Sequence, residues 1–94
     1  MTADARCLLV RIAGRVQGVC FRHYASQEAE RLGITGWVKN APNGDVEALI
    51  CGNGEQLAAM QVWLARGPSM AQVENMHAAP AELCEMPVSF RISF

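Results

Sequence analysis

The residues best suited to chemistry lie in one short run, GRVQGVCFR, from Gly14 to Arg22. The run holds two glycines, Gly14 and Gly18, and two arginines, Arg15 and Arg22. Glycines let a loop turn successive backbone N–H groups toward one point, which makes a nest for an anion. The planar guanidinium of Arg22 is suited to grip a phosphate group with two parallel hydrogen bonds. The run therefore predicts either a phosphate-binding loop or a plain glycine turn whose arginines are solvated.

Two other designs for phosphate chemistry do not fit this run. A Walker loop continues from its second glycine into Lys-Ser/Thr, whereas Gly18 is followed by Val19. A cysteine phosphatase places its arginine further from the nucleophilic cysteine, so that both reach one phosphate, but Cys20 and Arg22 are only two positions apart. A thiol at a helix N-terminus is acidic, yet this spacing favours Cys20 as an ordinary loop residue.

The run joins a predicted strand to a predicted helix. Residues 7–13 (CLLVRIA) alternate as a strand, with Leu8, Val10 and Ile12 on one face and Arg11 on the wetter face. Residues 21–32 predict a helix with one apolar stripe, made of Phe21, Ala25, Ala29 and Leu32. Arg22 then falls in the first helical turn, whose unpaired N–H groups and partial positive charge favour an anion.

The rest of the chain predicts five more elements. Strands at 35–40 and 45–51 flank APNG, and Asn43-Gly44 predicts the hairpin turn between them. A helix at 55–65 ends before Gly67-Pro68 and turns Leu57, Met60 and Leu64 inward. Residues 72–77 predict a weakly patterned strand, and residues 88–94 (VSFRISF) a last strand with Val88, Phe90, Ile92 and Phe94 on its buried face.

This order predicts an α+β fold of the ferredoxin-like, split β-α-β type: βαββαβ plus a short terminal strand, as a single domain over residues 1–94. Its antiparallel sheet would carry both helices on one face, with the 45–51 strand between the parallel strands 7–13 and 35–40. Asn40 would then close its strand near the loop and Arg22, although an Asn beside Ala-Pro-Asn-Gly is also typical of a plain turn former.

Composition excludes several other classes. The chain is 51% hydrophobic and 18% charged, and its eight Lys+Arg against nine Asp+Glu lack the basic excess of a duplex-binding domain. No apolar run of about 18 residues predicts a membrane span, and the N-terminus lacks a signal-peptide core, so we expect a cytoplasmic protein. Four cysteines without a CxxC pair, and two histidines, do not predict a zinc site.

Together with four further segments, the run GRVQGVCFR resembles a known family. The run GRVQGVCFR, with GITGWVKN at 33–40 and NGDVEA at 43–48, resembles the acylphosphatases, and WLARGP at 63–68 and the V-F-I terminal strand are similar too. The resemblance covers residues 7–94. It implies a small ferredoxin-like enzyme that hydrolyses the carboxyl-phosphate bond of acyl phosphates, without metal or cofactor.

The resemblance also implies roles for individual residues. Arg22 matches the phosphate-binding arginine of the GVxFR motif, and Asn40 matches the residue that positions the attacking water. The phosphate cradle would be made by five backbone amides, those of Arg15, Val16, Gln17, Gly18 and Val19. Cys20 occupies the variable position, so no covalent intermediate is expected. The implied partners are an acyl phosphate and inorganic phosphate, with no nucleic acid or membrane, and a monomer is the simplest expectation.

Cys7 and Cys51 meet in the predicted sheet. Cys7 opens one strand and Cys51 closes its antiparallel neighbour, and both side chains fall on the outer face. A bridge between them would close a loop of about 45 residues, and some bacterial members of the family carry one in a similar place. Two free thiols in a reducing cytosol are the alternative.

Other interpretations remain open from the sequence. A non-catalytic ferredoxin-like module that binds a phosphorylated ligand or RNA is one, although RNA-recognition sheets usually expose aromatics that strands 7–13 and 45–51 lack. A domain within a larger machine is disfavoured because the chain ends with the fold. The side chain of Gln17 either touches substrate or faces solvent, and His23 and His77 are typical surface residues.

Overall fold

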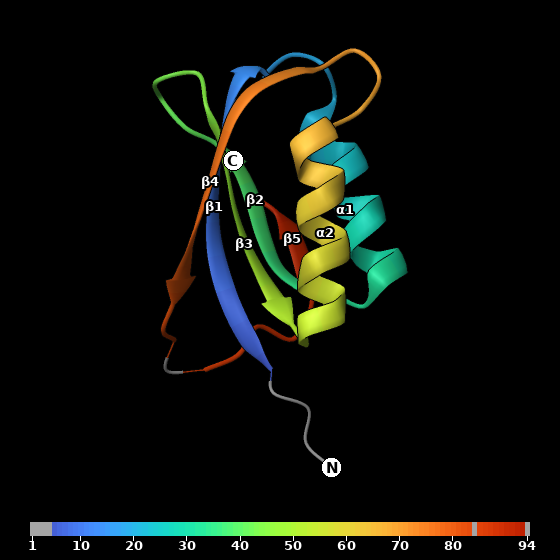
Figure 1. Cartoon of the computed structure of the whole chain (residues 1–94), viewed down its shortest axis with the longest axis vertical. Helices are drawn as coiled ribbons and strands as arrows, with labels where there is room; N and C mark the ends of the chain where they lie inside the picture. Colours follow the sequence, from blue (N-terminus) through green and yellow to red (C-terminus); the bar gives the residue numbers. More distant parts are fainter. Residues whose placement is uncertain (1–4, 84, 94) are drawn as a thin grey trace.

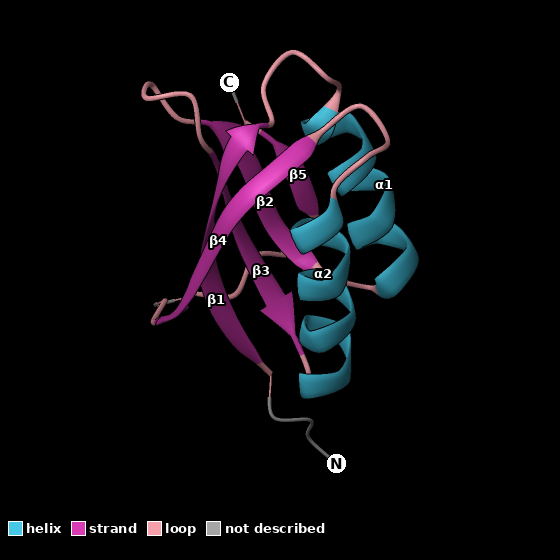
Figure 2. Ribbon diagram, turned by 45° about the horizontal axis from the view of Figure 1, so that its top comes forward, coloured by secondary structure: helices cyan, strands magenta, loops and turns pink. Residues whose placement is uncertain are grey.

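The computed structural model describes residues 5–83 and 85–93. It confirms the predicted α+β fold, because both helices pack on one face of a five-stranded sheet (Figures 1 and 2). In chain order the elements are β1 Arg6–Arg15, α1 Phe21–Leu32, β2 Thr35–Asn40, β3 Val46–Gly52, α2 Gly54–Arg66, β4 Gln72–Ala81 and β5 Phe90–Ile92.

The strand order β4-β1-β3-β2-β5 places the ends of β1 and β2 at one edge of the fold. Strand β3 is antiparallel to both, and its Val46 is the register partner of Ile12 on one side and of Asn40 on the other. Asn40 therefore lies level with Ile12, close to the end of β1 at Arg15, after which the loop to α1 begins. The predicted parallel relation of β1 and β2 is confirmed.

The last strand differs from the prediction. Only Phe90–Ile92 form β5, and this strand pairs in parallel with β2, so the sheet is mixed rather than wholly antiparallel. Val88, predicted to be buried, is 91% exposed because it precedes the strand. Phe90 is buried as predicted, and Phe94 lies outside the described residues. Strand β4 is longer than predicted, since it follows β1 as far as Ala81.

The main core lies between the sheet and the two helices. It is built from the faces that the periodicity predicted to point inward, namely Val10, Ile12, Phe21, Ala25, Ala29, Leu57, Met60 and Leu64, together with Val38, Val46 and Ile50. Burial of each large aliphatic side chain contributes about 1.5–3 kcal/mol. This packing fixes α1 against the sheet and so fixes the position of its N-terminus.

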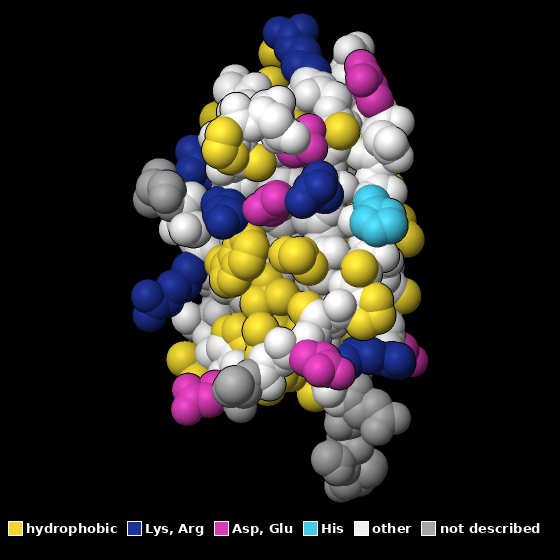
Figure 3. All heavy atoms as spheres, turned by 90° about the vertical axis from the view of Figure 1, so that its left-hand side faces the viewer, with side chains coloured by type: hydrophobic (Ala, Val, Ile, Leu, Met, Phe, Trp, Pro, Cys, Tyr) yellow, Lys and Arg dark blue, Asp and Glu magenta, His cyan; other side chains and the backbone are white. Residues whose placement is uncertain are grey.

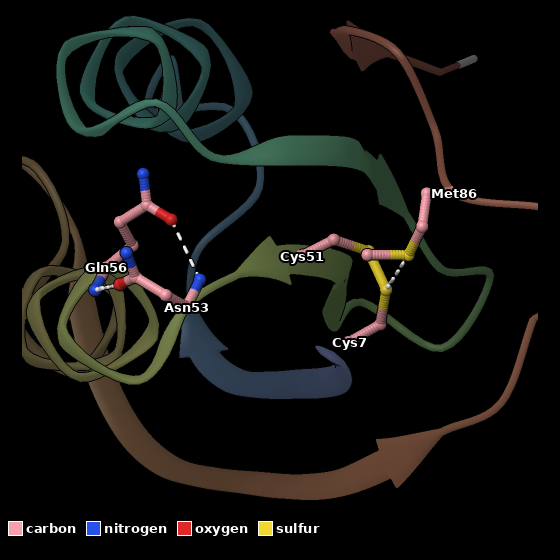
Figure 4. The surroundings of a disulfide bond; sticks show 5 residues. All are labelled: Cys7, Cys51, Asn53, Gln56 and Met86. Atoms are coloured by element: carbon pink, nitrogen blue, oxygen red, sulfur yellow. Dashed lines mark hydrogen bonds between the residues drawn. A yellow bond between two sulfur atoms is a disulfide. The ribbon is translucent and has the colours of Figure 1, made fainter. Parts of the chain in front are cut away.

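The outer face of the sheet carries the predicted cysteine pair. Cys7 and Cys51 are direct register partners and form a disulfide, with the sulfur atoms 2.11 Å apart (Figure 4). Both are buried in a small apolar cluster with Leu49, and Met86 Sδ lies 3.5 Å from Cys7 Sγ. The face predicted to be wetter therefore has an apolar centre, bordered by charged side chains (Figure 3).

We expect the double substitution Cys7→Ala/Cys51→Ala to lower the free energy of unfolding by about 3–4 kcal/mol, because the unfolded chain loses a cross-link. The measurement is urea denaturation of air-oxidised protein, followed by circular dichroism. Cys20→Ser is the matched control and should leave the midpoint unchanged. Equal midpoints for wild type and the double variant would contradict a stabilising bridge.

Candidate active site

A hollow of about 400 Å³ opens where β1 and β2 end. Its wall comes from the loop after β1, the first turn of α1, the last residue of β2 and strand β5. The lining residues are Val16, Gly18, Cys20, Phe21, Arg22, His23, Asn40 and Ile92. The fold thus brings together Arg22 and Asn40, the two side chains singled out in the sequence. Of the five predicted cradle residues, Val16 and Gly18 line the hollow.

Gly14 shapes the approach to the loop. Its φ of 127° accompanies a shift of register between β1 and β4, and a Cβ added there would lie 2.2 Å from the carbonyl oxygen of Gln72. No other residue type fits this position without moving the backbone. Gly18, at φ 77°, has open space around it, so it is required for its conformation and not for lack of room.

The N-terminus of α1 faces the hollow without a side-chain cap. Cys20 occupies the N-cap with φ 62° and makes no capping hydrogen bond, and no acidic residue lies in the first turn. Helix α2, by contrast, begins with a complete capping box in which Asn53 and Gln56 bond each other's backbone N–H (Figure 4). The N–H groups and positive end of α1 are therefore left for an anion.

Arg22 is half-buried, and its guanidinium is oriented by the end of the chain. Its Nη1 donates a hydrogen bond of 3.0 Å to the carbonyl oxygen of Ser93, which follows β5. Ser93 is held in turn, because its N–H donates to the carbonyl of Val38 in β2. Strand β5 thus serves as a support for Arg22, which the sequence did not predict because the acceptor is a backbone atom.

Gln17 has a role that differs from both sequence interpretations. Its Nε2 donates hydrogen bonds of 2.8 Å to two backbone carbonyls, those of Ala41 and Asp45, and so ties the loop to the turn between β2 and β3. The amide nitrogen is therefore neither directed at a substrate nor left to solvent. Only the tertiary structure reveals this contact, since its acceptors carry no side-chain signature.

Asn40 is exposed at the end of β2 and lines the hollow. The turn that follows is built by other groups, because Asn43 Oδ1 accepts from the Asp45 N–H and Gly44 N donates to the Ala41 carbonyl. Within residues 5–83 and 85–93 the structure contains no hydrogen bond from the Asn40 side chain. The alternative role of Asn40 as a turn former is therefore not the one that the structure displays.

The remaining titratable groups divide between the hollow and other surfaces. Cys20 and His23 line the hollow, and the His23 ring contacts the Tyr24 ring edge-on with centroids 5.2 Å apart, whereas His77 lies on β4. No Asp or Glu is among the described lining residues. Further along α1, a hydrogen bond from Arg31 lowers the pKa of the Glu28 carboxyl.

The described residues contain neither a metal-binding cluster nor a membrane-spanning helix. In residues 5–83 and 85–93 no three His, Cys, Asp or Glu side chains gather closely enough to hold a metal ion. No helix in this part of the chain has the length and apolar character needed to cross a membrane.

Comparisons with known proteins agree with one another. The sequence model of the family described as Acylphosphatase matches residues 8–92. The chain is 47% identical over 93 residues to an acylphosphatase of Rhizobium meliloti (strain 1021), which covers 99% of this chain and 98% of that protein. The chain is 54% identical over 70 residues to an acylphosphatase of Pseudomonas paraeruginosa (strain DSM 24068 / PA7), and these residues cover 74% of this chain and 77% of that protein. The structure of an acylphosphatase from Coxiella burnetii matches with a TM-score of 0.89 at 38% identity, over 95% and 93% of the two chains.

Cys20 has a left-handed backbone conformation, with a φ of 62°, which should lower the stability of the protein. A side chain with a Cβ is strained at this φ, so Cys20→Gly should raise the free energy of unfolding by about 0.5–1 kcal/mol after the entropic cost of glycine is subtracted. Urea denaturation measures the change. The control is Cys20→Ala, which keeps the Cβ and should bring no gain, and equal stability of the Gly and Ala variants would contradict the strain.

Proposed function

Because the chain belongs to the acylphosphatase family and is a hydrolase of acyl phosphates, we propose that the hollow beside the α1 N-terminus is its active site. The observation that carries the proposal is that Arg22, Asn40 and the uncapped end of α1 line one space of about 400 Å³. We further propose that the protein acts as a cytoplasmic monomer, needs no metal or cofactor, and binds neither nucleic acid nor membranes.

The phosphoryl group would be held by the loop and by Arg22. Backbone N–H groups of residues 15–19 would donate to its oxygens, and the guanidinium, oriented by the Ser93 carbonyl, would bind the same group. Phosphoryl transfer depends mainly on positioning and on stabilising charge on the equatorial oxygens. The hydrogen bonds of Gln17 support this assignment, because they hold the loop against the β2–β3 turn.

Asn40 would hold the attacking water in line with the bond that breaks. Its amide is neutral, and it can both accept from and donate to one water molecule. The water oxygen would bond to phosphorus while the bond from phosphorus to the carboxyl oxygen breaks, and a proton would pass from the water to a phosphate oxygen. The leaving carboxylate is stable as an anion, so the step needs no general acid and no covalent intermediate, and the Cys20 thiol takes no part.

Substitution of the two proposed catalytic residues should separate binding from chemistry. We expect Arg22→Ala to lower kcat/KM for benzoyl phosphate by ~10²–10³ and to weaken competitive inhibition by inorganic phosphate, because a charged donor is lost. Asn40→Ala should lower kcat by a similar factor but leave inhibition by phosphate unchanged. The measurement is initial-rate hydrolysis with and without phosphate, with EDTA present, which should not change the wild-type rate.

Arg66→Ala is the matched control for loss of an arginine, since Arg66 is exposed in the last turn of α2. Circular dichroism checks that each variant is folded. Full activity of a folded Arg22→Ala variant would overturn the assignment of the phosphate site, and unchanged turnover of Asn40→Ala would overturn the proposed holder of water.

The side chain of Gln17 should affect activity without touching the substrate. Gln17→Met keeps the length of the side chain but removes the donor to the Ala41 and Asp45 carbonyls. We therefore expect kcat/KM to fall, and the inhibition constant of phosphate to rise, by about tenfold. The exposed Gln27 on α1 provides the matched control, Gln27→Met, which should behave as wild type. Phosphate inhibition of wild-type strength in a folded Gln17→Met variant would rule out the supporting role.

A further inference from the structure

We infer that the acyl group of the substrate lies beside His23, and that the enzyme favours acyl phosphates whose acyl part carries a second negative charge. This inference rests on the proposed active site and deepens it. The phosphoryl group and the water would leave part of the hollow unused. Four lining residues hold neither group, and of these Phe21 is buried in the main core, so Cys20, His23 and Ile92 remain.

The hollow has room for more than a phosphoryl group. Its volume of about 400 Å³ falls within the range of sites that hold small organic ligands, roughly 300–1,000 Å³. Ile92, partly exposed on β5, supplies an apolar wall for the carbon skeleton of an acyl group. Cys20 adds a small, exposed thiol to the lining.

His23 is the remaining group that can recognise charge. It lies one residue after Arg22 in the first turn of α1, where the positive end of the helix faces the hollow. Its ring is exposed and makes an edge-on contact with the Tyr24 ring. An imidazole carries at least one N–H donor in either protonation state, so it can bind a carboxylate as well as add charge.

The described lining holds no group that would repel a second anion. Arg22 and His23 are its basic side chains, no Asp or Glu is among the lining residues, and the first turn of α1 has no acidic residue. On the same helix, Glu28 lines a separate hollow and is paired with Arg31. Within the described lining, a negative acyl group would therefore meet basic and not acidic side chains, while a cationic one would be repelled.

The test compares substrates of one shape that differ in charge. 3-Carboxybenzoyl and 4-carboxybenzoyl phosphate are each paired with the corresponding carbamoylbenzoyl phosphate, in which a neutral amide replaces the carboxylate. For at least one pair the wild type should show a kcat/KM ratio of about three- to fivefold in favour of the carboxylate, the size expected of an exposed charged contact. The difference should lie mainly in KM and should diminish at high salt.

His23→Ala should bring this ratio to one, whereas His23→Lys should keep it or raise it. His77→Ala is the matched control, because this exposed histidine lies on β4 away from the hollow, and it should preserve the wild-type ratio. Hydrolysis of benzoyl phosphate tests the proposed function separately, and it should continue in all three variants.

A ratio of one for both pairs in the wild type would overturn the inference, as would a preference that survives in folded His23→Ala. Either result, with benzoyl phosphate still hydrolysed, leaves the proposed function intact. A folded wild type that hydrolyses none of the five substrates would overturn the proposed function, and the inference with it.

Discussion

The two hydrogen bonds from the Gln17 amide to the hairpin carbonyls of Ala41 and Asp45 hold the hollow together. They join the loop after β1 to the turn that begins directly after Asn40. Val16 is buried in the main core and Val19 packs against it, which anchors the loop to the body of the fold. The Gln17 side chain adds direct hydrogen bonds between the loop and the turn, so it helps to fix the spacing between the proposed phosphate cradle and the proposed holder of water.

The two helix N-termini of this protein differ in their capping, as expected if the α1 end has the proposed role in binding phosphate. Helix α2 begins with reciprocal hydrogen bonds between Asn53 and Gln56, as expected of an end with only a structural role. Helix α1 begins at Phe21, and its N-cap residue Cys20 has a left-handed conformation and makes no side-chain capping hydrogen bond. Strain and unpaired N–H groups are tolerated at functional sites when the surrounding packing enforces them. A chain with a net charge of −1 thus builds a positive corner from backbone geometry and one arginine.

The sequence by itself determined most of the fold. Periodicity predicted both helices and the inner faces of β1 and β3, because residues that share a buried face recur at fixed local spacings. Asn43-Gly44 predicted the hairpin, since its chemistry is local to the turn. The predicted topology then placed Cys7 opposite Cys51 and Asn40 near Arg22. The resemblance of GRVQGVCFR and GWVKN to a family implied roles for Arg22 and Asn40.

The tertiary structure decided which side chains bond to backbone carbonyls and which strand pairs at the edge of the sheet. The partners of Gln17 and Arg22 are main-chain carbonyls, and a carbonyl has the same chemistry in every residue, so no pattern in the sequence identifies it. The short β5 likewise forms where β2 offers a free edge, so its alternating sequence overstated its length and left Val88 exposed. Local periodicity specifies which face of an element is buried, but only the assembled sheet specifies which backbone groups remain to be bonded.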